Sequence, residues 1–125
     1  MDEGNGASAE LRIVGAERPG GLELRTSGLA ARGLPELRVT ALPPYLGQGW
    51  ARVLADVARR LAGAPFGPGT APPDEVVLDH GVALGLVADA DEPGVLAVRP
   101  PDGHEGSPEA WRRDVLVRLF PAASV

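Results

Sequence analysis

Alternation of apolar and charged residues marks three strands in the first third of the chain. In the segments 10–15, 21–26 and 36–42, every second residue is aliphatic and the residues between are mostly charged or polar. Successive side chains of a strand point to opposite faces, so this pattern predicts an antiparallel sheet with one apolar and one solvated face. Turn-forming residues at 16–21 predict that the first two strands pair as a hairpin.

Helical periodicity follows over 45–63. The apolar residues of this segment fall on one face of a 3.6-residue helix: Leu46, Trp50, Val53, Leu54, Val57 and Leu61. Gly63 is a natural end for the helix. Gly47 and Gly49 weaken its first turn, so we expect the regular helix to start late.

Further strand patterns occupy the second half of the chain. They cover 75–81, 82–90 and 94–100, and the continuous apolar run of the first favours a central place in the sheet. A last alternating segment at 114–121 predicts a closing strand. The sequence Ser-Pro-Glu from Ser107 is also a good helix start, and the alternative is a short helix over 108–113 before that strand.

The order β-β-β-α-β-β-β-β groups strands in runs, which is typical of an α+β fold. We expect a mostly antiparallel sheet of about five to seven strands with one long amphipathic helix packed on one face. The chain has 125 residues, close to the size of one domain. Residues 1–9 are predicted to be a disordered tail and 10–125 a single α+β domain.

Composition narrows the function classes. The net charge of −5 argues against nucleic-acid binding. Signal-peptide features and an apolar run of membrane-spanning length are lacking, so we expect a cytoplasmic protein without a membrane partner. Cysteine is absent, which excludes disulfides and thiol nucleophiles. All twelve Lys and Arg positions are arginine, and this bias suggests a GC-rich bacterial source.

Catalytic candidates are few. Asp79 and His80 could serve as an acid–base pair. Neighbouring strand residues point to opposite faces, however, which favours a simple strand-end histidine in a turn. His104 and the acids at 89–92 are interpreted as solvated loop residues. No phosphate loop, serine-nucleophile elbow or metal-ligand spacing occurs, so we expect neither cofactor nor metal.

Binding candidates cluster in two places. Trp111 lies in a polar stretch, where an aromatic side chain usually anchors onto the core or onto a partner. Arg112 and Arg113 beside it could grip a carboxylate or phosphate, although a solvated face is the default interpretation. Arg25 and Arg38 belong to the polar face of the sheet, which is either a cross-strand charge ladder or a flat protein-docking surface. Both interpretations remain open.

One stretch resembles a pattern in small bacterial α+β proteins of a domain-of-unknown-function family. The residues are Thr26-Ser27-Gly28-Leu29 and Gly33-Leu34-Pro35-Glu36-Leu37, followed by a strand and a long amphipathic helix. The resemblance covers about residues 20–62, and less surely 75–121. It implies the same fold class and supplies no catalytic residue.

Two functional hypotheses follow. The first is a non-catalytic protein-binding or accessory module, immunity-type or assembly-associated, whose partner is another protein or a second copy of the chain. The alternative is a small cyclase- or isomerase-like enzyme with an apolar cavity between helix and sheet, using Asp79 and His80.

Overall fold

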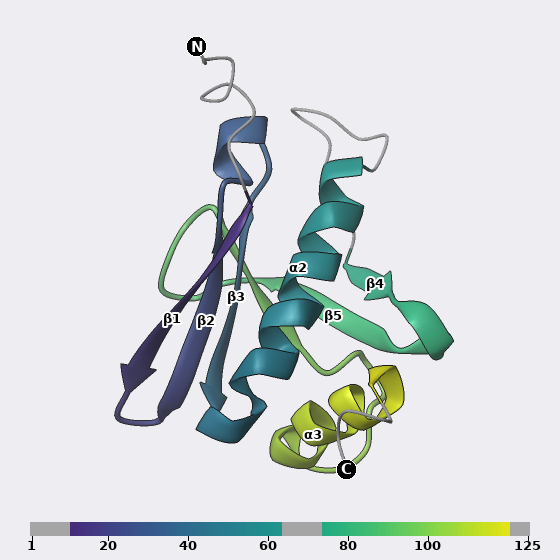
Figure 1. The fold of residues 1–125 in the computed structure, drawn as a ribbon. Coiled ribbons are helices and arrows are strands. Elements are labelled where there is room, and N and C mark those ends of the chain that lie inside the picture. The colour runs from purple at the N-terminus through teal and green to yellow at the C-terminus, as the bar shows by residue number, and fades with distance from the viewer. Residues whose placement is uncertain (1–10, 64–73, 121–125) are drawn as a thin grey trace.

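The computed structural model describes residues 11–63 and 74–120, in which a six-stranded sheet is accompanied by two α-helices (Figure 1). The predicted tail 1–9 lies outside the described residues. The strands are β1 (Arg12–Arg18), β2 (Gly21–Ser27), β3 (Glu36–Leu42), β4 (Glu75–Val77), β5 (Ala83–Ala88) and β6 (Val95–Arg99). The helices are α2 (Gly47–Gly63) and α3 (Pro108–Leu119). The α+β prediction is therefore confirmed.

The sheet is mixed. Its order is β1-β2-β3-β6-β5-β4, and β3 pairs with β6 in parallel while every other neighbouring pair is antiparallel. The crossover through α2 carries the chain past the centre of the sheet to β4, and two reversals then bring β6 back beside β3. The central place expected for 75–81 is wrong, because only Glu75–Val77 form a strand and that strand lies at the edge.

The first three strands follow the predicted alternation except at the end of β3, where Ala41 has a φ of 60° and is exposed while Leu42 is buried. β1 and β2 form the expected hairpin, although β1 extends to Arg18 and leaves only Pro19 and Gly20 for the turn. Leu24, Leu37 and Val39 are buried on the face that α2 covers. The hydrophobic side of the sheet is thus the side that the period-two pattern indicated.

All six residues of the predicted stripe are buried. Five of them lie on α2, and Leu46 lies in the 3-10 turn Pro44–Leu46 just before it. The regular helix begins at Gly47, later than the predicted segment 45–63, as expected, although it includes both glycines. Close packing explains both glycines. A Cβ at Gly47 would lie 2.6 Å from a methyl group of Leu22, and one at Gly49 would lie 2.6 Å from a methyl group of Leu116.

The predicted closing strand at 114–121 is wrong, because α3 runs through to Leu119. The helix start at Ser107 is real, and its hydroxyl oxygen accepts a hydrogen bond from the Ala110 amide at 3.1 Å. The helix does not stop after 108–113 as the alternative supposed. A capped first turn with proline at its start favours continuation.

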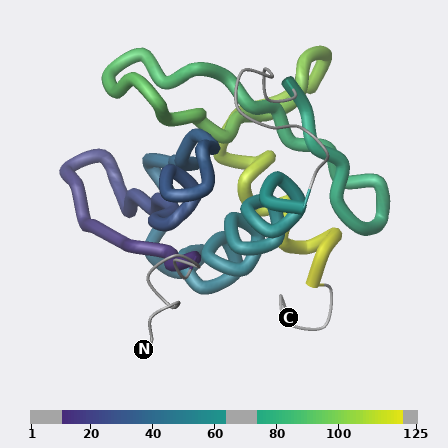
Figure 2. The backbone as a smooth tube through the Cα atoms, turned by 90° about the horizontal axis from the view of Figure 1, so that it is seen from above, coloured from purple at the N-terminus to yellow at the C-terminus, as the bar shows by residue number. Residues whose placement is uncertain are grey.

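The sheet is bent, and α2 lies in the angle between its two halves (Figure 2). α3 lies across one end of the sheet, near the start of α2 (Figure 1). The Trp50 indole donates a hydrogen bond to the main-chain oxygen of Arg112 at 3.0 Å, which ties the helices together. No helix among the described residues is long and apolar enough to cross a membrane.

Candidate functional site

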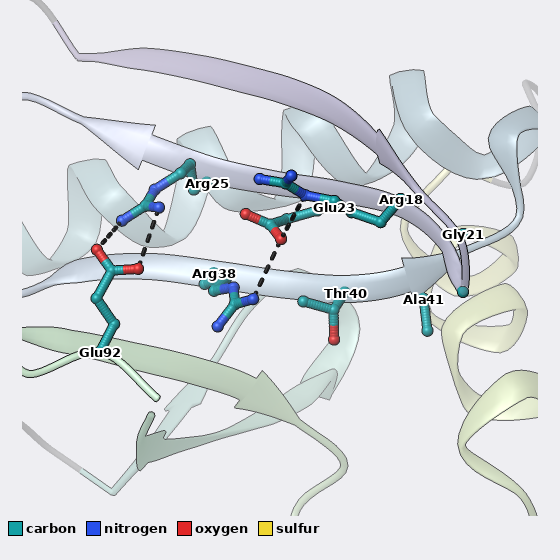
Figure 3. Close-up of a pocket in the computed structure, with 9 residues that line it drawn as sticks. Arg18, Gly21, Glu23, Arg25, Arg38, Thr40, Ala41 and Glu92 are labelled. Atoms are coloured by element: carbon teal, nitrogen blue, oxygen red, sulfur yellow. Dashed lines mark hydrogen bonds and ion pairs between the residues drawn. The ribbon is translucent and has the colours of Figure 1, made fainter. Parts of the chain in front are cut away.

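The face of the sheet opposite α2 carries a network of charged residues (Figure 3). Alternation along β2 directs Glu23 and Arg25 to this face, and Arg38 of β3 joins them. Glu23 is only 4% exposed, and its carboxylate lies 3.4 Å from Arg18 and 3.2 Å from Arg38. A buried carboxylate requires such partners, because an unpaired charge away from water is costly.

Arg25 and Arg38 are direct cross-strand partners, so two like charges face each other. Such a pair is destabilising unless acids lie nearby. The loop between β5 and β6 supplies those acids. Glu92 accepts two hydrogen bonds from Arg25, at 2.6 and 3.2 Å, and Asp89 accepts two from Arg38, at 3.0 and 3.1 Å. The expectation that these loop acids are simply solvated is therefore wrong for Glu92 and Asp89.

These contacts shift the protonation equilibria. The hydrogen bond to Glu92 raises the pKa of Arg25, and the hydrogen bond to Glu23 raises the pKa of Arg38. The hydrogen bond from Arg25 lowers the pKa of Glu92 from its ordinary value of 4.5. All three groups are held in their charged forms.

A shallow groove of about 410 Å³ lies on this face, lined by Arg18, Glu23, Arg25, Arg38 and Glu92 together with Thr40 and Ala41 (Figure 3). Its charged groups already bind one another. The cross-strand ladder therefore accounts for the positions of Arg25 and Arg38, and a ligand would have to break existing ion pairs to enter.

Glu36 does not belong to this ladder. Its carboxylate accepts hydrogen bonds from the Thr26 hydroxyl at 2.6 Å and from the amides of Gly28, Leu29 and Ala30 at 3.2, 3.3 and 3.0 Å. The carboxylate thus fastens the loop between β2 and β3 to the start of β3. These hydrogen bonds join the Thr-Ser-Gly-Leu and Pro-Glu segments that carry the family resemblance. The role that the structure shows for these segments is therefore structural.

A second cleft, of about 310 Å³, opens beside Arg38. We call it the β3–β6 cleft, and its polar lining consists of Arg38, Thr40, Asp89, Asp91, Arg99 and Arg112. The structure thus brings together Arg38 and Arg112, two predicted binding residues from distant parts of the chain.

Trp111 also lines this cleft and is an anchor onto the core. It is buried, and its ring centroid lies 5.4 Å from that of Trp50. Of the two roles that the sequence indicated for this tryptophan, the structure displays the core contact.

Arg113 is separated from these residues and lines another groove, of about 440 Å³, between the start of α2 and the end of α3. We call it the α2–α3 groove and define it by Tyr45, Arg52, Arg113, Val117 and Phe120. Tyr45 is 76% exposed and Val117 46% exposed. No acidic residue lines this groove.

Asp79 and His80 lie in a short 3-10 turn, Asp79–Gly81, and both are exposed. The strand predicted over 75–81 breaks there, because His80 and Gly81 adopt left-handed backbone conformations with φ of 60° and 72°. Asp79 binds Arg60 at 3.2 Å. Neither Asp79 nor His80 lines the shallow groove, the β3–β6 cleft or the α2–α3 groove.

The sequence pattern does not single out Tyr45 or Arg52 as binding residues. Tyr45 follows the double proline and falls within the segment 45–63 of helical periodicity, whereas it lies in the 3-10 turn Pro44–Leu46. Arg52 is on the polar side of α2, where arginines are ordinarily solvated. For Tyr45 the only sequence signal is an aromatic residue just ahead of a helix, and this signal is weak.

Within 11–63 and 74–120, no group of three or more His, Asp or Glu residues could hold a metal ion. Comparison of the chain with protein-family models, curated proteins and solved structures finds no match, so the family resemblance stays a prediction.

Proposed function

We propose that this chain is a non-catalytic protein-binding module of a bacterial cytoplasm, immunity-type or assembly-associated, that docks an acidic and apolar segment of a partner protein in the α2–α3 groove. The observation that carries the proposal is the joint exposure of Tyr45 and Val117 beside two arginines. Large apolar side chains exposed together in one groove are typical of interaction surfaces.

The chemistry of the groove selects the partner. Arg52 lies 5.7 Å from the centre of the Phe120 ring, which holds the guanidinium at the edge of the groove. Neither Arg52 nor Arg113 has an ion pair with another described residue. Since the groove has cations and no acids, a segment that presents carboxylates beside apolar side chains is complementary to it.

Aromatic residues and arginine are also the types enriched at protein–protein interfaces. The enzymatic alternative receives no comparable support. It expects a cavity between α2 and the sheet. Trp50, Leu54 and Val57, the central side chains of that interface, are fully buried. A groove of about 460 Å³ does lie between β1 and α2, bordered by Ile13, Ala55 and Ala62, but neither Asp79 nor His80 lines it.

Fluorescence anisotropy tests the proposal with a labelled helical peptide. The probe carries leucine at every third and fourth position and glutamate elsewhere, and a matched peptide has glutamine in place of each glutamate. We expect saturable binding of the acidic peptide, weakened by salt because the contacts are charged. Arg52→Gln or Arg113→Gln should weaken binding by at least about fivefold, equivalent to about 1 kcal/mol.

Matched controls are Arg59→Gln on α2 and Arg118→Gln on α3, both exposed and outside the groove. Equal binding of the two peptides, or equal losses in the control variants, would overturn the proposal.

Light scattering tests whether a second copy of this chain occupies the groove instead. A dimer that dissociates on Tyr45→Ser substitution would assign the groove to a second copy of this chain instead.

A further inference from the structure

A groove of about 440 Å³ lies between α3, the start of β5 and the loop that follows β6. We call it the His104 groove, and its ionisable lining residues are His104, Asp114 and Arg118. Of the described residues, only Val117 lines both this groove and the α2–α3 groove. The two grooves therefore adjoin each other but present different charged groups.

Asp114 and Arg118 lie one turn apart on α3 but do not bind each other. Their i,i+4 spacing is one at which an acid and an arginine of a helix commonly pair. Asp56 and Arg60 on α2 have the same spacing, and their side chains lie 3.1 Å apart. Asp114 and Arg118 form no ion pair with each other or with another residue in the described part of the chain. Two opposite charges thus border the groove, and both are available to a ligand.

The third polar side chain of the groove is supported by the core. The His104 imidazole lies edge-on to Trp111, with the ring centroids 6.4 Å apart. Trp111 is itself buried, and its ring centroid lies 5.4 Å from that of Trp50. Both imidazole nitrogens are able to form hydrogen bonds. His104 therefore adds a hydrogen-bonding group to the groove at a place that a buried ring maintains.

Apolar side chains lie beside these polar groups. Val117 is 46% exposed, although valine is a residue type that is usually buried. Pro101 and Ala83 also border the groove. A ligand that covers this apolar surface gains hydrophobic free energy in addition to its charged contacts.

We propose that the His104 groove binds a free α-amino acid with an apolar side chain, whose ammonium group pairs with Asp114 and whose carboxylate pairs with Arg118. The two charged groups of such a ligand are attached to one carbon atom. Side chains one helical turn apart start from β-carbons about 5–6 Å from each other, so both are able to reach them. The apolar side chain of the ligand would lie against Val117 and Pro101.

The charge balance of the groove favours this class of ligand. One carboxylate and one guanidinium offset each other, so a ligand with both charges is more complementary than a net anion or a net cation. The volume of the groove falls in the range of small-molecule sites, about 300–1,000 Å³.

Nuclear magnetic resonance tests the site on the full chain, because the indole N–H group of each tryptophan gives its own signal. The chain is titrated with leucine, with 4-methylpentanoate, which lacks the ammonium group, and with 3-methylbutylamine, which lacks the carboxylate. We expect leucine to shift the Trp111 signal saturably, because this ring lines the groove. The Trp50 signal should stay in place, because its N–H group is bonded to Arg112 in the core.

Each truncated probe should bind about fivefold more weakly than leucine, the upper range for one ion pair near the surface. Equal binding of leucine and either truncated probe, or a Trp111 signal that leucine does not move, would overturn the proposal.

Isosteric variants assign the two charges separately. Asp114→Asn should weaken leucine binding about fivefold without weakening the binding of 4-methylpentanoate, which has no ammonium group. Arg118→Gln should likewise weaken leucine binding without weakening the binding of 3-methylbutylamine. Equal losses for all three probes in either variant would contradict the assignment.

The site is tested independently of the α2–α3 groove. Arg118→Gln should weaken leucine binding and leave the binding of the acidic peptide unchanged, whereas Arg113→Gln should do the opposite. A loss of leucine binding in Arg113→Gln as large as that in Arg118→Gln would show that leucine does not bind in the His104 groove.

Discussion

At the scale of single residues, charge matching organises the face of the sheet away from α2. Arg25 and Arg38 face each other across two strands, and the repulsion is offset by Glu23 from the same strand pair and by Asp89 and Glu92 from the β5–β6 loop. The alternation in β2 and β3 predicted the first three of these residues. Asp89 and Glu92 were not predicted, because they are recruited from a segment that only folding brings close.

The pair formed by Arg25 and Glu92 should make stability depend on pH. Because Arg25 lowers the pKa of Glu92 from 4.5 in the folded chain, the unfolded chain takes up a proton first as the pH falls. The stabilisation is therefore complete above the ordinary value of 4.5 and is lost as the pH falls through the lowered pKa of the folded state.

Urea unfolding of the unaltered chain and of Glu92→Gln at a series of pH values measures this contribution. We expect the unaltered chain to be the more stable at neutral pH and the difference to disappear in acid. Glu105→Gln, at an exposed loop position, serves as the control. A difference that stays constant or grows as the pH falls would contradict the assignment.

At the scale of elements, α3 illustrates how one sequence satisfies two periodicities. Val115, Val117 and Leu119 occupy alternate positions, as the residues on one face of a strand do. Trp111, Val115 and Leu119 also recur at every fourth position, as the residues on one face of a helix do. In the structure Trp111 and Val115 are buried on the helical face and Val117 is left exposed. The cap at Ser107 and the contact with Trp50 favour the helix over the strand.

Removing the cap should weaken α3. Ser107→Ala leaves the Ala110 amide without its acceptor, and we expect a loss of about 1 kcal/mol in the free energy of unfolding. Urea denaturation followed by circular dichroism measures it. Ser107→Asp supplies another capping oxygen and should restore stability, whereas equal stability of Ser107→Ala and the unaltered chain would count against the cap.

At the scale of the whole molecule, α2 lies in the angle of a bent mixed sheet, and α3 lies across one end of that sheet (Figures 1 and 2). Leu54 lies at the middle of this arrangement and is fully buried with Trp50 and Val57. The clefts lie where this packing stops, one beside the separating strands β3 and β6 and one between the two helices. Some core residues also line these clefts, such as Trp111 in the β3–β6 cleft and Leu116 in the α2–α3 groove.

Truncation inside this core should be costly. Leu54→Ala is expected to lower the free energy of unfolding by about 2–5 kcal/mol through lost burial and the cavity left behind. Val87→Ala on β5, where the side chain is about half exposed, should cost less than about 0.5 kcal/mol. The two losses are compared by urea unfolding, and similar values would show that α2 does not form the centre of the core.

The local pattern alone determined β2, β3 and the buried stripe of α2, because burial of one face imposes a period that the chain displays directly. It also singled out Arg25, Arg38, Arg112 and Arg113, though without their neighbours. Tertiary structure decided the parallel β3–β6 pair, the edge position of β4, the helical state of α3 and the separation of Arg112 from Arg113 into different clefts. Each of these depends on contacts between segments distant in sequence, whose free energy no local period encodes.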